Sequence, residues 1–254
     1  MTSRIRRTVP SGRPRRHRSP GWVPAQHGAW AMVASPLLLG ALASGLAWVH
    51  LPLAAFWLAG YFAFNAASVW LKSGRKSRFL RPLQAYAALA AVLGGLTLAM
   101  SPGLLRWAPL FALPLGVGLW AAANRRERDL LAGVTTVVGS ALMTIVAYDA
   151  GHGSDMRRAW LLAAGQFLYF AGTVFYVKSM IRERDNPAFL RLSIAFHVVA
   201  AVLVAGASRW LGAVFAVLAF RAWWIPRLGW TPKQVGIAEI AATAAVALVS
   251  LFTV

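Results

Sequence analysis

Residues 130–148 read LLAGVTTVVGSALMTIVAY, which is 19 residues in succession without a charged side chain. A helix that crosses the hydrocarbon core of a bilayer needs about 20 such residues. The rest of the 254-residue chain is similar in character, because 59% of its residues are hydrophobic and only 13% are charged. Soluble domains carry roughly a quarter charged residues. The sequence therefore predicts an all-α, polytopic integral membrane protein.

Nine apolar segments have a suitable length to span a bilayer. They cover residues 29–49, 52–71, 83–101, 104–123, 130–148, 159–177, 192–207, 210–225 and 236–254. Residues 1–22 contain seven arginines but neither an acidic residue nor an apolar core, so we expect a disordered basic tail and not a signal peptide. Residues 23–254 then form a membrane helix bundle. The chain has no cysteine, which excludes disulfides and thiolate metal sites.

Positive charge alternates from one connection to the next. Of the 26 Lys and Arg residues, 22 lie in the tail and around the connections after the second, fourth, sixth and eighth segments. The other four are Arg106, Arg157, Arg158 and Arg209. The positive-inside rule therefore predicts a cytoplasmic N-terminus and a C-terminus outside. We attribute the net charge of +19 to this topology and to lipid headgroups, and expect no nucleic-acid partner.

Two of the predicted helices carry a stripe of polar side chains. The first stripe is Tyr61, Asn65, Ser68 and Lys72; the second is Gln166, Tyr169, Thr173 and Tyr176. Their spacing places each set on one helix face. In both segments Tyr-Phe-Ala is followed by an aromatic residue, an aliphatic residue, Lys and Ser. The stripes are either hydrogen-bonding seams between helices or the walls of a ligand site at a repeat interface.

Four further polar residues lie near the expected cytoplasmic ends of the helices. They are His27, Asn124, His197 and Glu239. For His27 and His197 we expect hydrogen bonds, to a carbonyl and between helices respectively. For Glu239 we expect an ion pair with Lys233 or Arg221, with proton transfer as the alternative.

Three segments carry a resemblance to a known family. PAQHGAWAM at 24–32, GTVFYVKSMIRER at 172–184 and PKQVGIAE at 232–239 resemble the YwiC-like family of bacterial membrane proteins. The resemblance covers the membrane part of the chain and not the basic tail. It implies a location in the bacterial inner membrane, and it implies no particular activity.

A more distant resemblance is to the UbiA prenyltransferase superfamily. It implies nine helices, with Asp-rich motifs that hold magnesium after the second and sixth. Here Asn65 matches the first motif, but its carboxylates are absent, and the second loop offers Glu183 and Asp185 among arginines. Magnesium commonly uses one or two carboxylates together with phosphate. The departure implies that any metal-dependent diphosphate chemistry is lost or altered.

These features define a candidate ligand site at the cytoplasmic end. Lys72, Arg75, Arg81, Lys178 and Arg182 are expected to hold an anionic or isoprenoid lipid headgroup, and Asn65, Tyr176 and Asp185 to orient it. An altered UbiA-like enzyme and a non-catalytic transporter or assembly subunit remain alternatives. The sequence identifies no cofactor, because magnesium has few candidate ligands and haem would depend on His27 and His197 alone. It indicates no oligomeric state.

Overall fold

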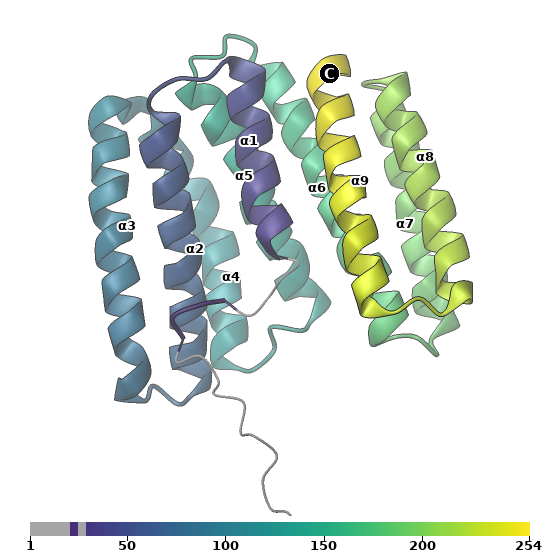
Figure 1. The fold of residues 1–254 in the computed structure, drawn as a ribbon, viewed down its shortest axis with the longest axis horizontal. Coiled ribbons are helices and arrows are strands. Elements are labelled where there is room, and N and C mark those ends of the chain that lie inside the picture. Colours follow the sequence, from purple (N-terminus) through teal and green to yellow (C-terminus); the bar gives the residue numbers. More distant parts are fainter. Residues whose placement is uncertain (1–20, 25–28) are drawn as a thin grey trace, which may run out of the picture.

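The computed structural model describes residues 21–24 and 29–254, which form nine α-helices and three 3₁₀ segments without a strand (Figure 1). The helices are α1 (Ala29–Ser44), α2 (His50–Lys72), α3 (Leu80–Met100), α4 (Ala112–Ala123), α5 (Leu130–Ala150), α6 (Met156–Ile181), α7 (Pro187–Ala205), α8 (Arg209–Trp224) and α9 (Pro232–Thr253). The 3₁₀ segments are Ser77–Phe79, Pro102–Phe111 and Ile225–Leu228. Residues 1–20 of the predicted tail, and His27, lie outside the described residues.

Each of the nine predicted segments corresponds to a helix, and eight helical spans are long and apolar enough to cross a membrane. The chain is thus a multi-pass membrane protein. The boundaries differ from the prediction by several residues at several helices, and two of these differences have a clear backbone cause. The first helix ends at Ser44 because Gly45 takes a left-handed conformation with φ of +91°. The fourth span begins as the 3₁₀ segment Pro102–Phe111, whose Pro109 has no N–H to donate to an α-helical ladder.

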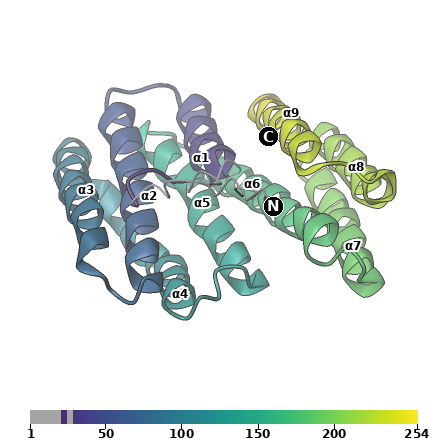
Figure 2. The ribbon, with the colours of Figure 1, turned by 60° about the horizontal axis from the view of Figure 1, so that its bottom comes forward.

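The bundle has a buried centre and two outer groups of helices (Figures 1 and 2). α5 packs against α1, α4 and α6, while α6 also packs against α7 and α9. Within their apolar windows, 61% of α5 and 56% of α6 is buried, against 6% for the span that contains α3. α5 and α6 therefore form the centre, and the outer helices present apolar side chains to lipid.

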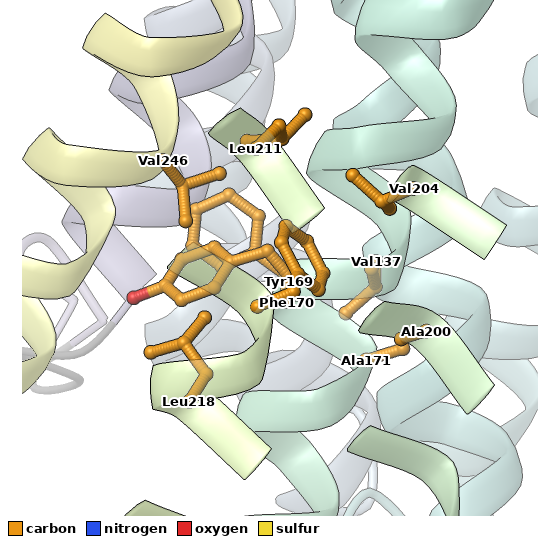
Figure 3. Close-up of a cluster of buried hydrophobic side chains, with 10 residues drawn as sticks. Val137, Tyr169, Phe170, Ala171, Ala200, Val204, Leu211, Leu218 and Val246 are labelled. Carbon is orange, nitrogen blue, oxygen red and sulfur yellow. The ribbon is translucent and has the colours of Figure 1, made fainter. Parts of the chain in front are cut away.

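Close approach at the centre depends on small residues. Gly40 of α1 lies against α5, where an added Cβ would be 2.2 Å from the Thr144 carbonyl oxygen. Close backbone approach at glycine is a common way for membrane helices to pack. A cluster of buried apolar side chains joins α5 to α9 and includes Val137, Phe170, Leu211 and Val246 (Figure 3). The Tyr169 hydroxyl points out of this cluster towards α9.

The connections after α2, α4, α6 and α8 lie at one end of the bundle, the lower end in Figure 1. We call this the basic end, because these connections carry most of the Lys and Arg residues outside the tail. The structure thus gathers the basic connections on one side, as the alternation of charge predicts. That this side faces the cytoplasm stays a prediction of the positive-inside rule.

Candidate functional site

Two residues of the polar stripe of α6, Tyr169 and Thr173, face α9 and hold its carboxylate. Tyr169 Oη donates to the Glu239 carboxylate at 3.1 Å, and Thr173 Oγ1 donates to the same carboxylate oxygen, Oε2, at 2.8 Å. Tyr169 Oη also lies 2.8 Å from Thr243 Oγ1, one turn further along α9. Tyr169 and Thr173 therefore form a hydrogen-bonding seam with α9 that is centred on Glu239, whereas Gln166 of the same stripe accepts from Ser35 of α1 at 3.0 Å.

α8 contributes the positive charge that balances this carboxylate. Arg221 Nη1 forms an ion pair with Glu239 Oε1, and both side chains are largely buried, at 12% and 14% exposed. The guanidinium carbon lies 4.2 Å from the centre of the Tyr176 ring, within range of a cation–π contact. The expected Glu239–Arg221 pair is present. α6, α8 and α9 thus converge on one charge pair within the membrane part of the bundle.

Several hydrogen-bond donors of this cluster have no acceptor among the described residues. Arg221 Nε and Nη2, together with the Tyr176 hydroxyl, are buried and have no hydrogen-bond partner among the described residues. A buried donor without a partner costs about 1–3 kcal/mol, and more when the group is charged. A structural ion pair would be expected to satisfy the remaining guanidinium donors as well. The open donors indicate that Arg221 has capacity for a second acceptor.

The cluster lies close to the basic end. Arg221 is three residues before the end of α8, and Tyr176 is five residues before the end of α6. Glu239 is seven residues after the start of α9. At 1.5 Å per residue these positions are about 5–10 Å inside the helix ends. Phe220, Trp223 and Trp224 are exposed beside Arg221, which is typical of a membrane interface.

His197 of α7 packs against α6 at Gly172 and makes a different contact from the one expected. Its Nδ1 lies 2.7 Å from the Ser193 carbonyl oxygen of its own helix, α7. The contact with α6 is one of packing, because a Cβ at Gly172 would lie 3.0 Å from Nε2. The expected hydrogen bond between helices is therefore replaced by one within α7, where the carbonyl four residues earlier is in reach.

The polar stripe of α2 does not meet the stripe of α6. α2 packs mainly against α3 and α4, and α5 lies between it and α6 (Figure 2). Lys72 pairs with Glu127 at 2.8 Å, and Asn65 is half-buried without a hydrogen bond in the described structure. Arg75 and Arg81 are exposed. The four predicted site residues on this side therefore form no joint cluster with Tyr176.

The remaining predicted site residues surround the ends of α6 and α4. Lys178 Nζ lies 5.5 Å from the Phe189 ring centre, while Arg182 and Asp185 are exposed after α6. Arg184 reaches the connection between α8 and α9, since a Cβ at Gly229 would lie 3.8 Å from its Nη2. Asn124 donates to the Trp120 carbonyl oxygen at 2.8 Å and ends α4. The loop after α6 thus lies over the same end as Arg221.

Metal ligands do not gather at this end within the described residues. No three His, Asp or Glu side chains there are close enough to share an ion. Glu183 accepts a hydrogen bond from Asn186 at 3.0 Å, and Asp185 stands exposed beside it. These two acids do not fit the paired motifs that the distant enzyme resemblance would require, so we derive no step that uses magnesium.

Sequence reasoning assigned Arg221 only as a loop charge and a candidate partner for Glu239, and did not place it in the ligand site. It missed Thr243 entirely. A signal for both was available, because Thr243 follows Glu239 by four residues and Arg221 lies one turn from the end of an otherwise apolar segment. Helical spacing would have placed Glu239 and Thr243 on one face.

Comparisons with known proteins agree over most of the chain. The family model described as YwiC-like protein matches residues 23–148. A Bacillus subtilis (strain 168) protein named uncharacterized protein YwiC is 33% identical over 224 residues, which is 86% of this chain and 92% of that protein. An uncharacterized protein of Haemophilus influenzae Rd is 27% identical over 229 residues, with the same coverage. No solved structure matches.

Proposed function

The chain belongs to the YwiC-like family of membrane proteins, and we propose that it binds a phosphate-bearing lipid, with Arg221 as the principal headgroup ligand. The observation that carries this proposal is the pair of open guanidinium donors, Nε and Nη2, buried near the basic end. The planar guanidinium fork matches phosphate oxygens and binds them with two parallel hydrogen bonds. The open Tyr176 hydroxyl supplies a further donor beside it.

The surroundings of Arg221 suit a lipid better than a soluble anion. Lys178, Arg182 and Arg184 belong to the α6–α7 side of the basic end and would attract an anionic headgroup from the leaflet. On the outer face of α8, Val217 and Phe220 are 66% and 59% exposed. An isoprenoid or acyl tail can lie along this apolar face while its headgroup reaches Arg221.

Access to the guanidinium requires α8 to move slightly, because Tyr176 covers it. α8 packs mainly against α7 and more lightly against α9. Figure 2 shows α7 and α8 as a pair at the edge of the bundle. A small outward movement of this pair would open Arg221 to the leaflet, and it would loosen the core cluster in which Leu211 and Phe215 of α8 pack against Phe170 of α6.

The test compares lipids that carry a phosphate-bearing headgroup with lipids of the same tails that lack it. Native mass spectrometry of the detergent-extracted full chain would measure retention of dioctanoyl-phosphatidylglycerol, dioctanoylglycerol, geranylgeranyl phosphate, geranylgeraniol and inorganic phosphate. We expect the two phosphate-bearing lipids to bind at least tenfold more tightly than their uncharged counterparts, since a hydrogen bond to a charged group contributes about 1.5–3 kcal/mol. Inorganic phosphate alone should bind weakly, and tight binding of it would indicate a soluble anion as the ligand.

Two variants locate the site. Arg221→Gln combined with Glu239→Gln removes the charge pair without leaving either partner unpaired, and it should abolish the preference for phosphate. Arg209→Gln is the control, because Arg209 lies at the opposite end of the same helix, where its guanidinium carbon is 5.2 Å from the centre of the Trp210 ring. Equal preference in the double variant and the native chain would overturn the assignment to Arg221.

A further inference from the structure

Glu239 stands out among the carboxylates of the described chain. Two acidic residues lie within α-helices there, Asp149 and Glu239. Asp149 is next to the last residue of α5, at the end opposite the basic end, where it pairs with Arg106 and accepts from Trp107. Glu239 lies two turns inside α9 and is held by α6 and α8. A carboxylate this far inside a membrane helix has a functional role by default.

We infer that Glu239 takes up a proton when an anionic lipid binds Arg221, so that the site receives a proton and an anion together. This inference rests on the proposed function. In the absence of ligand, one cation and one carboxylate give a site that is neutral overall. A phosphate placed on Arg221 would bring a second negative charge close to the Glu239 carboxylate. Like charges about 5 Å apart in a partly buried site weaken binding on the order of 100-fold. Protonation of Glu239 removes this repulsion.

The hydrogen bonds around Glu239 can serve both protonation states. Its carboxylate partners on α6 are hydroxyls, Tyr169 and Thr173, and hydroxyls can donate or accept. When Glu239 is protonated, its new O–H can donate to Thr173 Oγ1. The Tyr169 proton can then turn to Thr243 Oγ1, which lies 2.8 Å away and can act as donor or acceptor. The carboxyl group therefore keeps a hydrogen bond with Thr173, and Tyr169 keeps one with Thr243, while Arg221 Nη1 is released to the phosphate.

Few other groups can take the proton. Four titratable or charged groups of the described residues lie around Glu239. They are Arg221 on α8, Tyr169 and Tyr176 on α6, and Lys233, which precedes Glu239 by six residues on α9. His197 lies beyond Gly172 on α7, and α1 has no titratable side chain. Arginine stays charged, and tyrosine is already protonated at neutral pH. Glu239 is thus the group in direct contact with Arg221 that can gain a proton.

Calorimetry can count the protons. The full chain in lipid nanodiscs would be titrated with dioctanoyl-phosphatidylglycerol at several pH values, each in two buffers of different ionisation enthalpy. We expect about one proton taken up per lipid bound by the native chain, and affinity that falls up to tenfold per unit rise in pH, as linkage requires. Glu239→Gln, which keeps the size and most hydrogen bonds of the side chain, should bind lipid with no proton uptake and no such pH dependence.

Asp149→Asn is the matched control, because it removes the other helical carboxylate and should leave proton uptake unchanged. Equal proton uptake by the native chain and Glu239→Gln would overturn the inference while the proposed lipid site stands. Failure of the native chain to bind the lipid would overturn both. If Glu239→Gln does not fold, the pH dependence of the native chain decides, and affinity independent of pH would contradict the coupling.

Discussion

Two tyrosines of this bundle carry buried hydroxyl groups in opposite situations. Tyr169 Oη contacts Glu239 and Thr243, whereas Tyr61 Oη has no partner among the described residues. Both side chains contact other rings, so removing the oxygen leaves the aromatic packing in place. The comparison separates the contribution of the hydroxyl from that of the ring.

Tyr169→Phe should destabilise the protein by about 1–3 kcal/mol, because it leaves a buried carboxylate with fewer hydrogen bonds. Tyr61→Phe should be neutral or stabilising, because a buried hydroxyl without a partner costs free energy. Unfolding of each purified variant in mixed micelles with rising SDS would give the difference. An equal change in stability in both variants would show that the hydrogen bonds of Tyr169 contribute no more than the hydroxyl of Tyr61, which has no partner among the described residues.

At the scale of single residues, the polar residues of the seam could be predicted from spacing, but the helices that they contact could not. Helical spacing correctly put Tyr169, Thr173 and Tyr176 on one face, and the need for a counter-charge correctly suggested Arg221 for Glu239. Periodicity says which face is polar but not which helix it meets. The pairing of the α2 and α6 stripes could therefore not be checked from spacing, and the structure places α5 between those helices.

At the scale of the elements, helix ends decide where the site residues lie. Hydropathy predicted all nine helices, since length and apolar content suffice for a membrane span. It did not predict the end of α1 at Ser44 or the 3₁₀ segment before α4, because these depend on the backbone angles of Gly45 and on Pro109. The start of α9 is set by a capping box at Thr231 and Gln234.

The α9 capping box positions Glu239 eight residues later. Thr231 Oγ1 accepts a hydrogen bond from the backbone N–H of Gln234. Gln234 Oε1 accepts one from the backbone N–H of Thr231 at 2.9 Å. Thr231→Ala should therefore cost about 0.5–2 kcal/mol, while Thr231→Ser should cost little. The same SDS unfolding measurement would test this. A loss in Thr231→Ser as large as in Thr231→Ala would contradict the capping role and indicate instead a role for the threonine methyl group.

For the whole molecule, positive charge is arranged at two depths. The connections after α2, α4 and α6 carry exposed arginines at the basic end. Arg221 lies deeper in the bundle than these arginines, and its charge is balanced by Glu239. Exposed charge can orient the protein in the membrane and attract lipid, whereas a buried guanidinium with open donors can bind a headgroup. Orientation and binding therefore fall largely to different residues, although both depend on which leaflet the basic end faces.

The orientation can be tested because the chain has no cysteine of its own, so one introduced thiol gives a unique label. Ser154 lies in the exposed connection between α5 and α6, and Ser77 lies in the exposed connection between α2 and α3 at the basic end. We expect a membrane-impermeant maleimide to label Ser154→Cys in intact bacterial cells and Ser77→Cys only after the membrane is opened, because the positive-inside rule retains basic loops in the cytoplasm. Labelling of Ser77→Cys in intact cells would show that the topology is the reverse of the predicted one. It would also place Arg221 in the outer leaflet, so the lipid that reaches the site would have to come from that side.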